Sequence, residues 1–174
     1  MNIAEIKIND IANGEGVRTS LFVSGCRHRC PDCFNSIAWD FDYGKPFTEE
    51  IQSEILKSVS PYWIEGISLL GGEPFEPENQ KDLLDFLIKY KKEYPNKTVW
   101  CYSGFTFEEI TGKAPSRAHT DISLNLLEMI DVLVDGRYEK TLKNIMLKFR
   151  GSENQRVIDV KKTLARNEIV LYLD

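Results

Sequence analysis

Apolar residues along the chain alternate between two spacings, one typical of buried strands and one typical of amphipathic helices. Leu21, Phe22 and Val23 form a continuous apolar run, which indicates a strand. Ile51, Ile55 and Val59 recur every four residues, which indicates one face of a helix. This pattern predicts strands at residues 18–24, 66–70, 97–102, 131–135, 157–160 and 169–173, and helices at 48–59, 77–94 and 121–130, with a short helix opening at a capping box in 106–109.

The alternation of strands and helices indicates an α/β domain. Strands that are joined by helices pair in parallel through right-handed crossovers. The length of 174 residues favours one domain, residues 1–174, over two. In such a sheet, functional residues gather at the carboxyl ends of the strands. We therefore expect the segments that follow four of these strands to meet at one rim.

Composition and charge exclude several classes of protein. Lys and Arg number 22 and Asp and Glu number 27, so the net charge of −5 argues against direct nucleic-acid binding. No run approaches the roughly 18 apolar residues that a membrane helix needs. The first residues show no secretory signal, so we expect a cytoplasmic protein with reduced thiols.

Three of the four cysteines are crowded into eight residues. Cys26, Cys30 and Cys33 are separated by three and two residues, whereas Cys101 lies far away in a predicted strand. Three thiolates on one loop suit an iron–sulfur cluster with one iron left open. A zinc site that His28 completes is the alternative on the residues alone. An ordinary buried cysteine is the expected role of Cys101.

A second motif, Gly71-Gly72-Glu73-Pro74, ends the predicted strand at 66–70. Together with the cysteine spacing, it resembles the radical S-adenosylmethionine (SAM) enzymes. Four further stretches are similar to one family of glycyl-radical-enzyme activating proteins, that of the anaerobic ribonucleoside-triphosphate reductase. They are residues 16–28, residues 30–35 with Trp39 just beyond, residues 131–136 and residues 150–156.

The resemblance implies a fold and two cofactors. The fold would be an incomplete, curved (β/α) barrel of the radical SAM type with a mainly parallel sheet. Cys26, Cys30 and Cys33 would each bind one iron of a [4Fe–4S] cluster, and the fourth iron would bind SAM. Reductive cleavage of SAM would yield a 5′-deoxyadenosyl radical, which takes a hydrogen atom from a glycine of the partner enzyme. No catalytic residue is expected beyond the cluster ligands, because the cofactor carries the chemistry.

The resemblance also implies which residues would contact SAM. The backbone at Asp32, Cys33 and Phe34 would lie beside the adenine. The turn of Gly71, Gly72, Glu73 and Pro74 would bind the methionine ammonium, and Ser103 and Asp135 would bond ribose hydroxyls. A plain strand-to-helix turn remains open for the glycine motif, and a cap or turn role remains open for Ser103 and Asp135.

The expected partners are the anaerobic ribonucleoside-triphosphate reductase and an electron donor such as flavodoxin. Residues 137–166 hold nine Lys or Arg and three Asp or Glu. Within this basic third, the candidate contacts for SAM or the partner are Arg150, Ser152, Asn154 and Arg156. A solvated face is the alternative for such a run. Two other functions stay open: activation of a different glycyl-radical enzyme, and a non-enzymatic metal or electron-transfer module.

Overall fold

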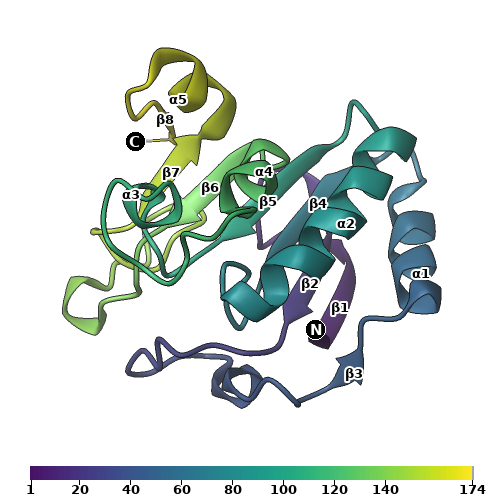
Figure 1. Ribbon diagram of the computed structural model, residues 1–174, viewed down its shortest axis with the longest axis horizontal. Coiled ribbons are helices and arrows are strands. Elements are labelled where there is room, and N and C mark those ends of the chain that lie inside the picture. The colour runs from purple at the N-terminus through teal and green to yellow at the C-terminus, as the bar shows by residue number, and fades with distance from the viewer. Residues whose placement is uncertain (174) are drawn as a thin grey trace.

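The computed structural model describes residues 1–173, and its centre is one eight-stranded sheet (Figure 1). The strands lie in the order β3-β1-β2-β4-β5-β6-β7-β8. Their bounds are β1 Asn2–Asp10, β2 Val17–Val23, β3 Lys45–Pro46, β4 Ile64–Gly71, β5 Thr98–Tyr102, β6 Val132–Asp135, β7 Arg156–Asp159 and β8 Leu171–Leu173.

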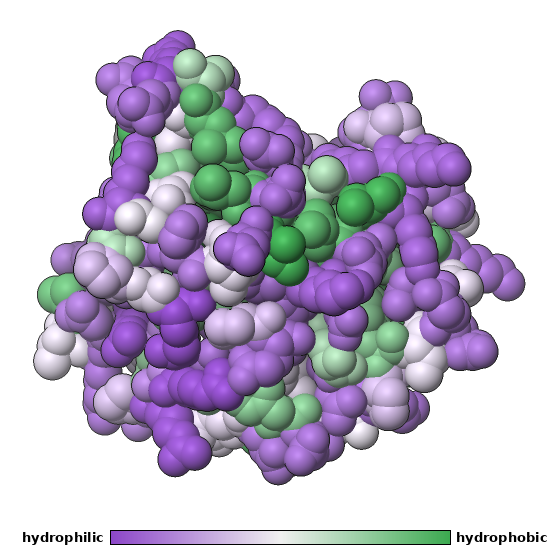
Figure 2. All heavy atoms as spheres, in the orientation of Figure 1, coloured by the Kyte–Doolittle hydropathy of each residue, from purple (hydrophilic) through white to green (hydrophobic). Residues whose placement is uncertain are grey.

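Helices cover one face of this sheet and enclose the main core. The helices are α1 Glu49–Val59, α2 Pro77–Glu93, α3 Phe107–Ile110, α4 Ser123–Glu128 and α5 Val160–Arg166, with 3-10 turns η1 Ser36–Trp39 and η2 Lys140–Leu142. Buried residues of α1, α2 and α4, such as Ile55, Phe86 and Leu126, share one apolar cluster with Leu69 and Leu133 of the sheet. The outer sides of these helices are mostly hydrophilic, and apolar atoms on that face gather in small patches (Figure 2). None of the helices within residues 1–173 has the length and apolar character to cross a membrane.

Most of the predicted elements are confirmed, because their signals are local. The capping box is present: the Thr106 hydroxyl accepts from the Glu109 N–H, and the Glu109 carboxylate accepts from the Thr106 N–H. The helix predicted at 121–130 is shorter in the structure, since α4 begins at Ser123 with Ile122 at its N-cap, so Asp121 does not cap it. The pattern did not predict β1, although it is the longest strand.

The prediction of a mainly parallel, incomplete (β/α) barrel is wrong, although the broader α/β class holds. Three of the seven strand pairings are parallel, namely β2–β4, β4–β5 and β5–β6, and the other four are antiparallel. The six residues between β1 and β2 are too short for a parallel crossover. The segment between β6 and β7 returns through a loop whose only helical turn is η2, so β7 also runs back. The result is a mixed sheet with β3 and β8 at its edges.

A buried arginine joins three strands on the sheet face opposite α1 and α2. Arg18 is 1% exposed and donates to the Ser68 hydroxyl at 2.9 Å, to the Ile67 carbonyl at 2.8 Å and to the Thr98 carbonyl at 2.9 Å. Its guanidinium lies 5.7 Å from the Trp100 ring. Burial lowers the pKa of Arg18 to about 10. These contacts hold β2, β4 and β5 side by side, and so align the strand ends that carry the site.

Candidate functional site

A cavity of about 570 Å³ lies at the carboxyl ends of the three parallel pairings. It is lined by residues at or just beyond the ends of four strands: Cys26 after β2, Gly71 at the end of β4, Tyr102 at the end of β5 and Gly136 after β6. The prediction that four strand ends share one rim is therefore confirmed. The volume is in the range of small-molecule sites.

The three crowded cysteines lie on one loop at this cavity. The loop leaves β2 and returns beside its own start, since the Gly25 N–H donates to the Ala38 carbonyl (2.8 Å) and the Cys26 N–H to the Trp39 carbonyl (3.1 Å). Cys26, Cys30 and Cys33 all line the cavity. Cys101 lies in β5, is fully buried, and packs in the main core. The structure thus separates Cys101 from the other three, as predicted.

The surroundings of the Cys26 and Cys30 thiols favour their protonated form in the protein alone. Burial, together with the charge of Glu73, raises the pKa of Cys26 to about 12. Burial and the neighbouring Cys33 also raise the pKa of Cys30. A metal that binds these sulfurs must displace their protons. Within residues 1–173, no three His, Cys, Asp or Glu side chains converge on a point that could hold one metal ion. The cysteines of an iron–sulfur cluster bind separate irons and need no such point.

The two glycines at the end of β4 let the backbone lie against the cysteine loop. Gly71 has φ +110°, and a Cβ on Gly72 would lie 2.6 Å from the Gly25 carbonyl oxygen. The close approach makes two hydrogen bonds, from the Gly72 N–H to the Val23 carbonyl (2.7 Å) and from the Glu73 N–H to the Gly25 carbonyl (2.8 Å). Gly71, Gly72 and Glu73 line the cavity, and Pro74 is buried.

This close approach predicts the effect of a single methyl group. We expect Gly72→Ala to lower the free energy of unfolding by about 1–2 kcal/mol, because the backbone must move away from Gly25. Urea unfolding of the metal-free protein measures this. Gly151→Ala is the matched control for an added methyl group, since Gly151 lies outside the left-handed region and its Cβ would meet side chains alone, with the Tyr138 ring nearest at 3.1 Å. An unchanged unfolding curve for Gly72→Ala would contradict the predicted clash.

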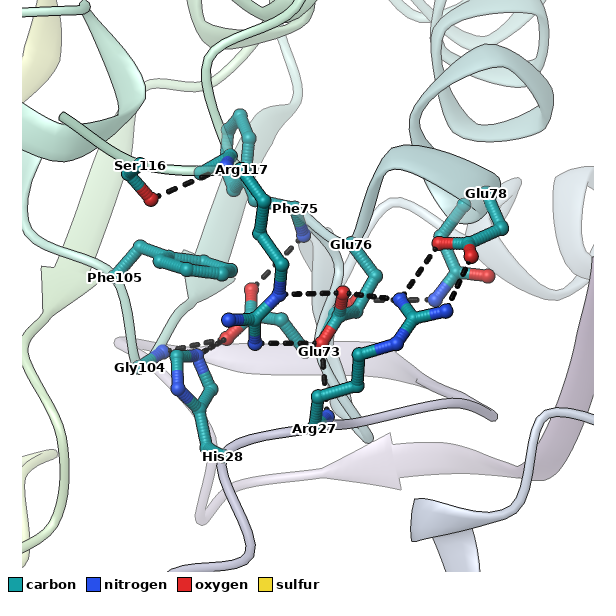
Figure 3. Close-up of polar contacts among 12 residues, drawn as sticks. Arg27, His28, Glu73, Phe75, Glu76, Glu78, Gly104, Phe105, Ser116 and Arg117 are labelled. Carbon is teal, nitrogen blue, oxygen red and sulfur yellow. Dashed lines mark hydrogen bonds and ion pairs between the residues drawn. The ribbon is translucent and has the colours of Figure 1, made fainter.

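Glu73 is a buried carboxylate with four polar groups around it, of which Figure 3 labels those of Phe75, Gly104 and His28. It is 1% exposed. It accepts from the Phe75 N–H (2.9 Å), the Ser103 hydroxyl (2.8 Å) and the Gly104 N–H (2.7 Å), and His28 Nε2 lies 3.0 Å away. Glu73 therefore ties the cysteine loop and the loop after β5 to the end of β4. Ser103 lines the cavity, and its hydroxyl is already engaged with Glu73.

A second carboxylate, Glu76, holds the same loop from its outer side. It is fully buried and accepts four hydrogen bonds, two from Arg27 and two from Arg117, at 2.8–2.9 Å (Figure 3). The two guanidiniums lie over the rings of Phe41 and Phe105. Burial opposes ionisation, but the hydrogen bonds from Arg117 and Arg27 lower the pKa of Glu76. Sequence analysis missed this cluster, whose only signal was an acidic residue directly after the Gly71–Phe75 turn.

The tip of the cysteine loop is exposed at the mouth of the cavity. Asp32 has φ +58° and forms an ion pair with Lys140 at 2.6 Å. Hydrogen bonding to Lys140 lowers the pKa of Asp32. Phe34 lines the cavity although it is 84% exposed. The loop tip thus lies between the cavity and the basic segment around η2.

The segment after β6 folds back over the cavity, and two of its four candidate polar residues hold the protein itself together. Arg156 makes ion pairs with Asp135 (2.5 Å) and Glu108 (2.7 Å), which raise its pKa. Asp135 is 1% exposed and also accepts from the Phe107 N–H. Ser152 is fully buried and accepts from the Glu139 N–H.

The other two candidates of this segment differ in position. Arg150 lines the cavity and donates to the Gln155 carbonyl. Asn154 is exposed and donates to the Arg137 carbonyl.

Three buried polar atoms, each on a residue that lines this cavity, have no hydrogen-bond partner in residues 1–173. They are His28 Nδ1, Trp39 Nε1 and the Tyr102 hydroxyl, and all three residues line the cavity. A buried polar group without a partner costs about 1–3 kcal/mol, so native proteins rarely keep one unless a ligand or water completes it. The cavity is therefore suited to a polar ligand next to the three thiols.

Comparisons with known proteins agree with this geometry. A family model described as a 4Fe-4S single cluster domain matches residues 12–158. An anaerobic ribonucleoside-triphosphate reductase-activating protein of Pasteurella multocida is 39% identical over 157 residues, covering 89% of this chain and 95% of the relative. Proteins of the same name in Escherichia coli K12 and bacteriophage T4 are each 36% identical, over 90% of this chain and 97% and 93% of the relatives. The chain belongs to this family.

As a member of the anaerobic ribonucleoside-triphosphate reductase-activating proteins, the chain has a 4Fe-4S cluster domain that includes all three cavity cysteines. The same matched stretch holds the Gly71-Gly72 turn, Glu73 and the three unpartnered atoms. Sequence analysis quoted Trp39 and named the strand that ends in Tyr102, but it assigned neither a role. The structure places both residues in the cavity lining, each with a buried polar atom that has no partner.

Proposed function

We propose that this chain is an iron–sulfur radical SAM enzyme that generates a glycyl radical on the anaerobic ribonucleoside-triphosphate reductase. One observation carries the proposal: a single cavity is lined by the three cysteines, by the Gly71-Gly72 turn and by three residues that each carry an unpartnered buried polar atom. The names of the relatives supply the partner.

In this proposal Cys26, Cys30 and Cys33 hold a [4Fe–4S] cluster and leave its fourth iron for SAM. The bound cluster would supply the one electron that breaks the S–C5′ bond of SAM, so that methionine leaves and the 5′-deoxyadenosyl group would remove a hydrogen atom from a glycine Cα of the reductase. The chain itself binds, orients and shields these groups.

Around the cluster, the chain's other residues would bind SAM. Gly71 and Gly72 admit a ligand close to the backbone. The turn that they form with Glu73 and Pro74 would bind the methionine ammonium. The backbone at Asp32 and Phe34 remains the predicted adenine contact.

The two predicted ribose contacts, Ser103 and Asp135, already form hydrogen bonds or ion pairs within the protein. Ser103 lines the cavity and remains the predicted ribose contact. Its hydroxyl already donates a hydrogen bond to Glu73, so its oxygen would accept from the ribose. Asp135, also predicted to bond the ribose, has its carboxylate paired with Arg156 and the Phe107 N–H. Any contact of Asp135 with SAM would be additional to these.

A protein substrate would reach the site through the mouth of the cavity. Phe34 at the loop tip and Ile145 and Met146 in the segment after η2 are at least 84% exposed. Arg150 and Lys143 line the same opening with positive charge. A glycine on a segment of the reductase would approach here, and an electron donor such as flavodoxin would reduce the cluster in the cytoplasm.

The test is anaerobic reconstitution with iron and sulfide, followed by reduction in the presence of SAM. We expect about four irons per chain and release of 5′-deoxyadenosine. Adding the anaerobic ribonucleoside-triphosphate reductase should produce a glycyl-radical signal in its electron paramagnetic resonance (EPR) spectrum. A different glycyl-radical enzyme serves as the control substrate.

Each alternative gives a distinct result. Zinc in place of iron, or iron without 5′-deoxyadenosine, would overturn the proposal in favour of a metal or electron-transfer module. Cleavage of SAM with a radical only on the other glycyl-radical enzyme would overturn the choice of partner.

A further inference from the structure

A finger of residues 142–153 projects from the protein directly after η2. Its two arms run antiparallel, since Lys143 and Ser152 form a β-bridge and the Glu153 N–H donates to the Leu142 carbonyl at 2.9 Å. In Figure 1 this segment is the light-green loop that extends away from the sheet at the lower left. The backbone hydrogen bonds therefore give the finger a defined shape outside the sheet.

The turn at the tip of the finger presents two apolar side chains to water. The Asn144 side-chain oxygen accepts from the Met146 N–H (2.9 Å), and the Asn144 amide nitrogen donates to the Glu153 carboxylate (3.0 Å). Ile145 is 86% exposed and Met146 is 84% exposed. Single exposed apolar residues are common on protein surfaces, but two adjacent ones on an ordered turn gain almost no burial from folding. The turn thus fixes an apolar pair where a partner can bury it.

The same part of the chain carries an excess of positive charge. Residues 137–150 hold five basic side chains and one acidic side chain, Glu139. Within residues 1–173, only Lys140 of the five forms an ion pair, with Asp32 at 2.6 Å. The other four are Arg137, Lys143, Lys148 and Arg150. Because the whole chain carries a net charge of −5, this positive patch is local, and a local patch of opposite sign orients a charged partner as it approaches.

The base of the finger belongs to the lining of the cavity. Lys143, Phe149 and Arg150 line it. The Phe149 ring packs edge-on against the ring of Trp100 in β5, with 5.1 Å between centroids. The ion pair between η2 and the cysteine loop holds the segment that leads into the finger. A protein bound to the finger would therefore lie over the mouth of the cavity, next to the three cysteines.

We propose that the finger is the docking element for the protein substrate, and that the surface it binds is acidic and has an apolar pocket for Ile145 and Met146. The inference rests on the proposed function for the identity of that substrate, the reductase. The charges of Arg137, Lys143 and Lys148 attract and orient the acidic surface, and burial of the apolar tip then holds it. Docking on the finger brings a segment of the reductase to the mouth and leaves the cavity itself to SAM.

The test measures the Kd of the reductase for the anaerobically reconstituted protein. Lys148→Glu reverses one charge of the finger, and a double variant, Ile145→Ser with Met146→Ser, removes the apolar tip. We expect the Kd for the reductase to rise about tenfold in each variant. None of the three residues lines the cavity, so the Kd for SAM should be unchanged. Binding of the reductase should weaken as the salt concentration rises, and less steeply in Lys148→Glu.

Two matched variants test whether position on the finger matters. Lys57→Glu reverses the same charge at an exposed position of α1, which lies on the opposite side of the molecule from the finger (Figure 1). Ile88→Ser removes an isoleucine of α2 that is 50% exposed. Both variants should bind the reductase as tightly as the unmodified protein.

The outcomes separate this inference from the proposed function. If the unmodified protein neither cleaves SAM nor forms the glycyl radical, the proposed function fails, and this inference fails with it. If it forms the radical and the finger variants bind the reductase equally well, only the inference is overturned. Equal losses in Lys57→Glu and Lys148→Glu would overturn it in favour of a general effect of net charge. Self-association that the finger variants abolish would overturn it in favour of a second copy of the chain as the bound protein.

Discussion

Replacing Cys33 by alanine should abolish both cluster assembly and SAM cleavage. Cys33 lines the cavity with Cys26 and Cys30, and the variant would keep only two thiols for a site that already leaves one iron to SAM. We expect iron content after anaerobic reconstitution, and 5′-deoxyadenosine after reduction, to fall to background. Iron analysis and chromatography of the nucleoside products measure these two quantities.

The fourth cysteine provides the matched control for this experiment. Cys101 is fully buried in β5 and packs in the main core. Cys101→Ala should keep full iron content and SAM cleavage, and should lose about 1 kcal/mol of stability from the small cavity it creates. Activity that survives in Cys33→Ala, or is lost in a folded Cys101→Ala protein, would refute the assignment of the ligands.

Glu76→Gln should be the most destabilising of the polar substitutions at the site. The fully buried carboxylate accepts four hydrogen bonds from Arg27 and Arg117, and the amide accepts fewer and carries no charge. We expect the free energy of unfolding to fall by about 3 kcal/mol at neutral pH, which is near the lower limit for a broken buried ion pair. The lower limit applies because both guanidiniums remain in contact with water. Urea unfolding of the metal-free protein measures it, and looser packing of the cysteine loop should lower iron uptake.

The pH dependence of this loss follows from the lowered pKa of Glu76. A carboxyl whose pKa is lower in the folded protein stabilises it above the unfolded pKa, about 4.5, and this stabilisation disappears as pH falls through the folded value. The difference between the unmodified protein and Glu76→Gln should therefore be full at pH 7 and shrink below about pH 4.5. A difference that stays constant down to acid denaturation would contradict this account.

Glu78→Gln is the matched control for the charge change. Glu78 pairs with the same arginine, Arg27, but both side chains are about half exposed. Surface ion pairs of this kind contribute about 0–1 kcal/mol, so the control should differ little from the unmodified protein. An equal loss in both variants would mean that the negative charge itself, and not the buried hydrogen-bond cluster, stabilises the loop.

Much of the candidate site could be predicted from the sequence because its signals are local. The spacing of Cys26, Cys30 and Cys33 and the turn at Gly71-Gly72 are short motifs, and the structure places all five residues on one cavity. The roles of Glu73 and Glu76 could not be predicted. Their partners, Ser103 and Arg117, lie 30 and 41 positions away, and no local pattern links them.

By itself, the sequence determined the strands at 18–24, 66–70, 97–102 and 131–135, the main helices and the loop that carries the thiols, because periodicity and turn residues act over a few positions. Only the tertiary structure decided the direction of β1, β7 and β8, which makes the sheet mixed. It also decided which buried polar atoms have a hydrogen-bond partner. Hydrogen-bond partners and burial depend on chain segments that are distant in sequence, so only the fold reveals that His28, Trp39 and Tyr102 each carry a buried polar atom without a partner.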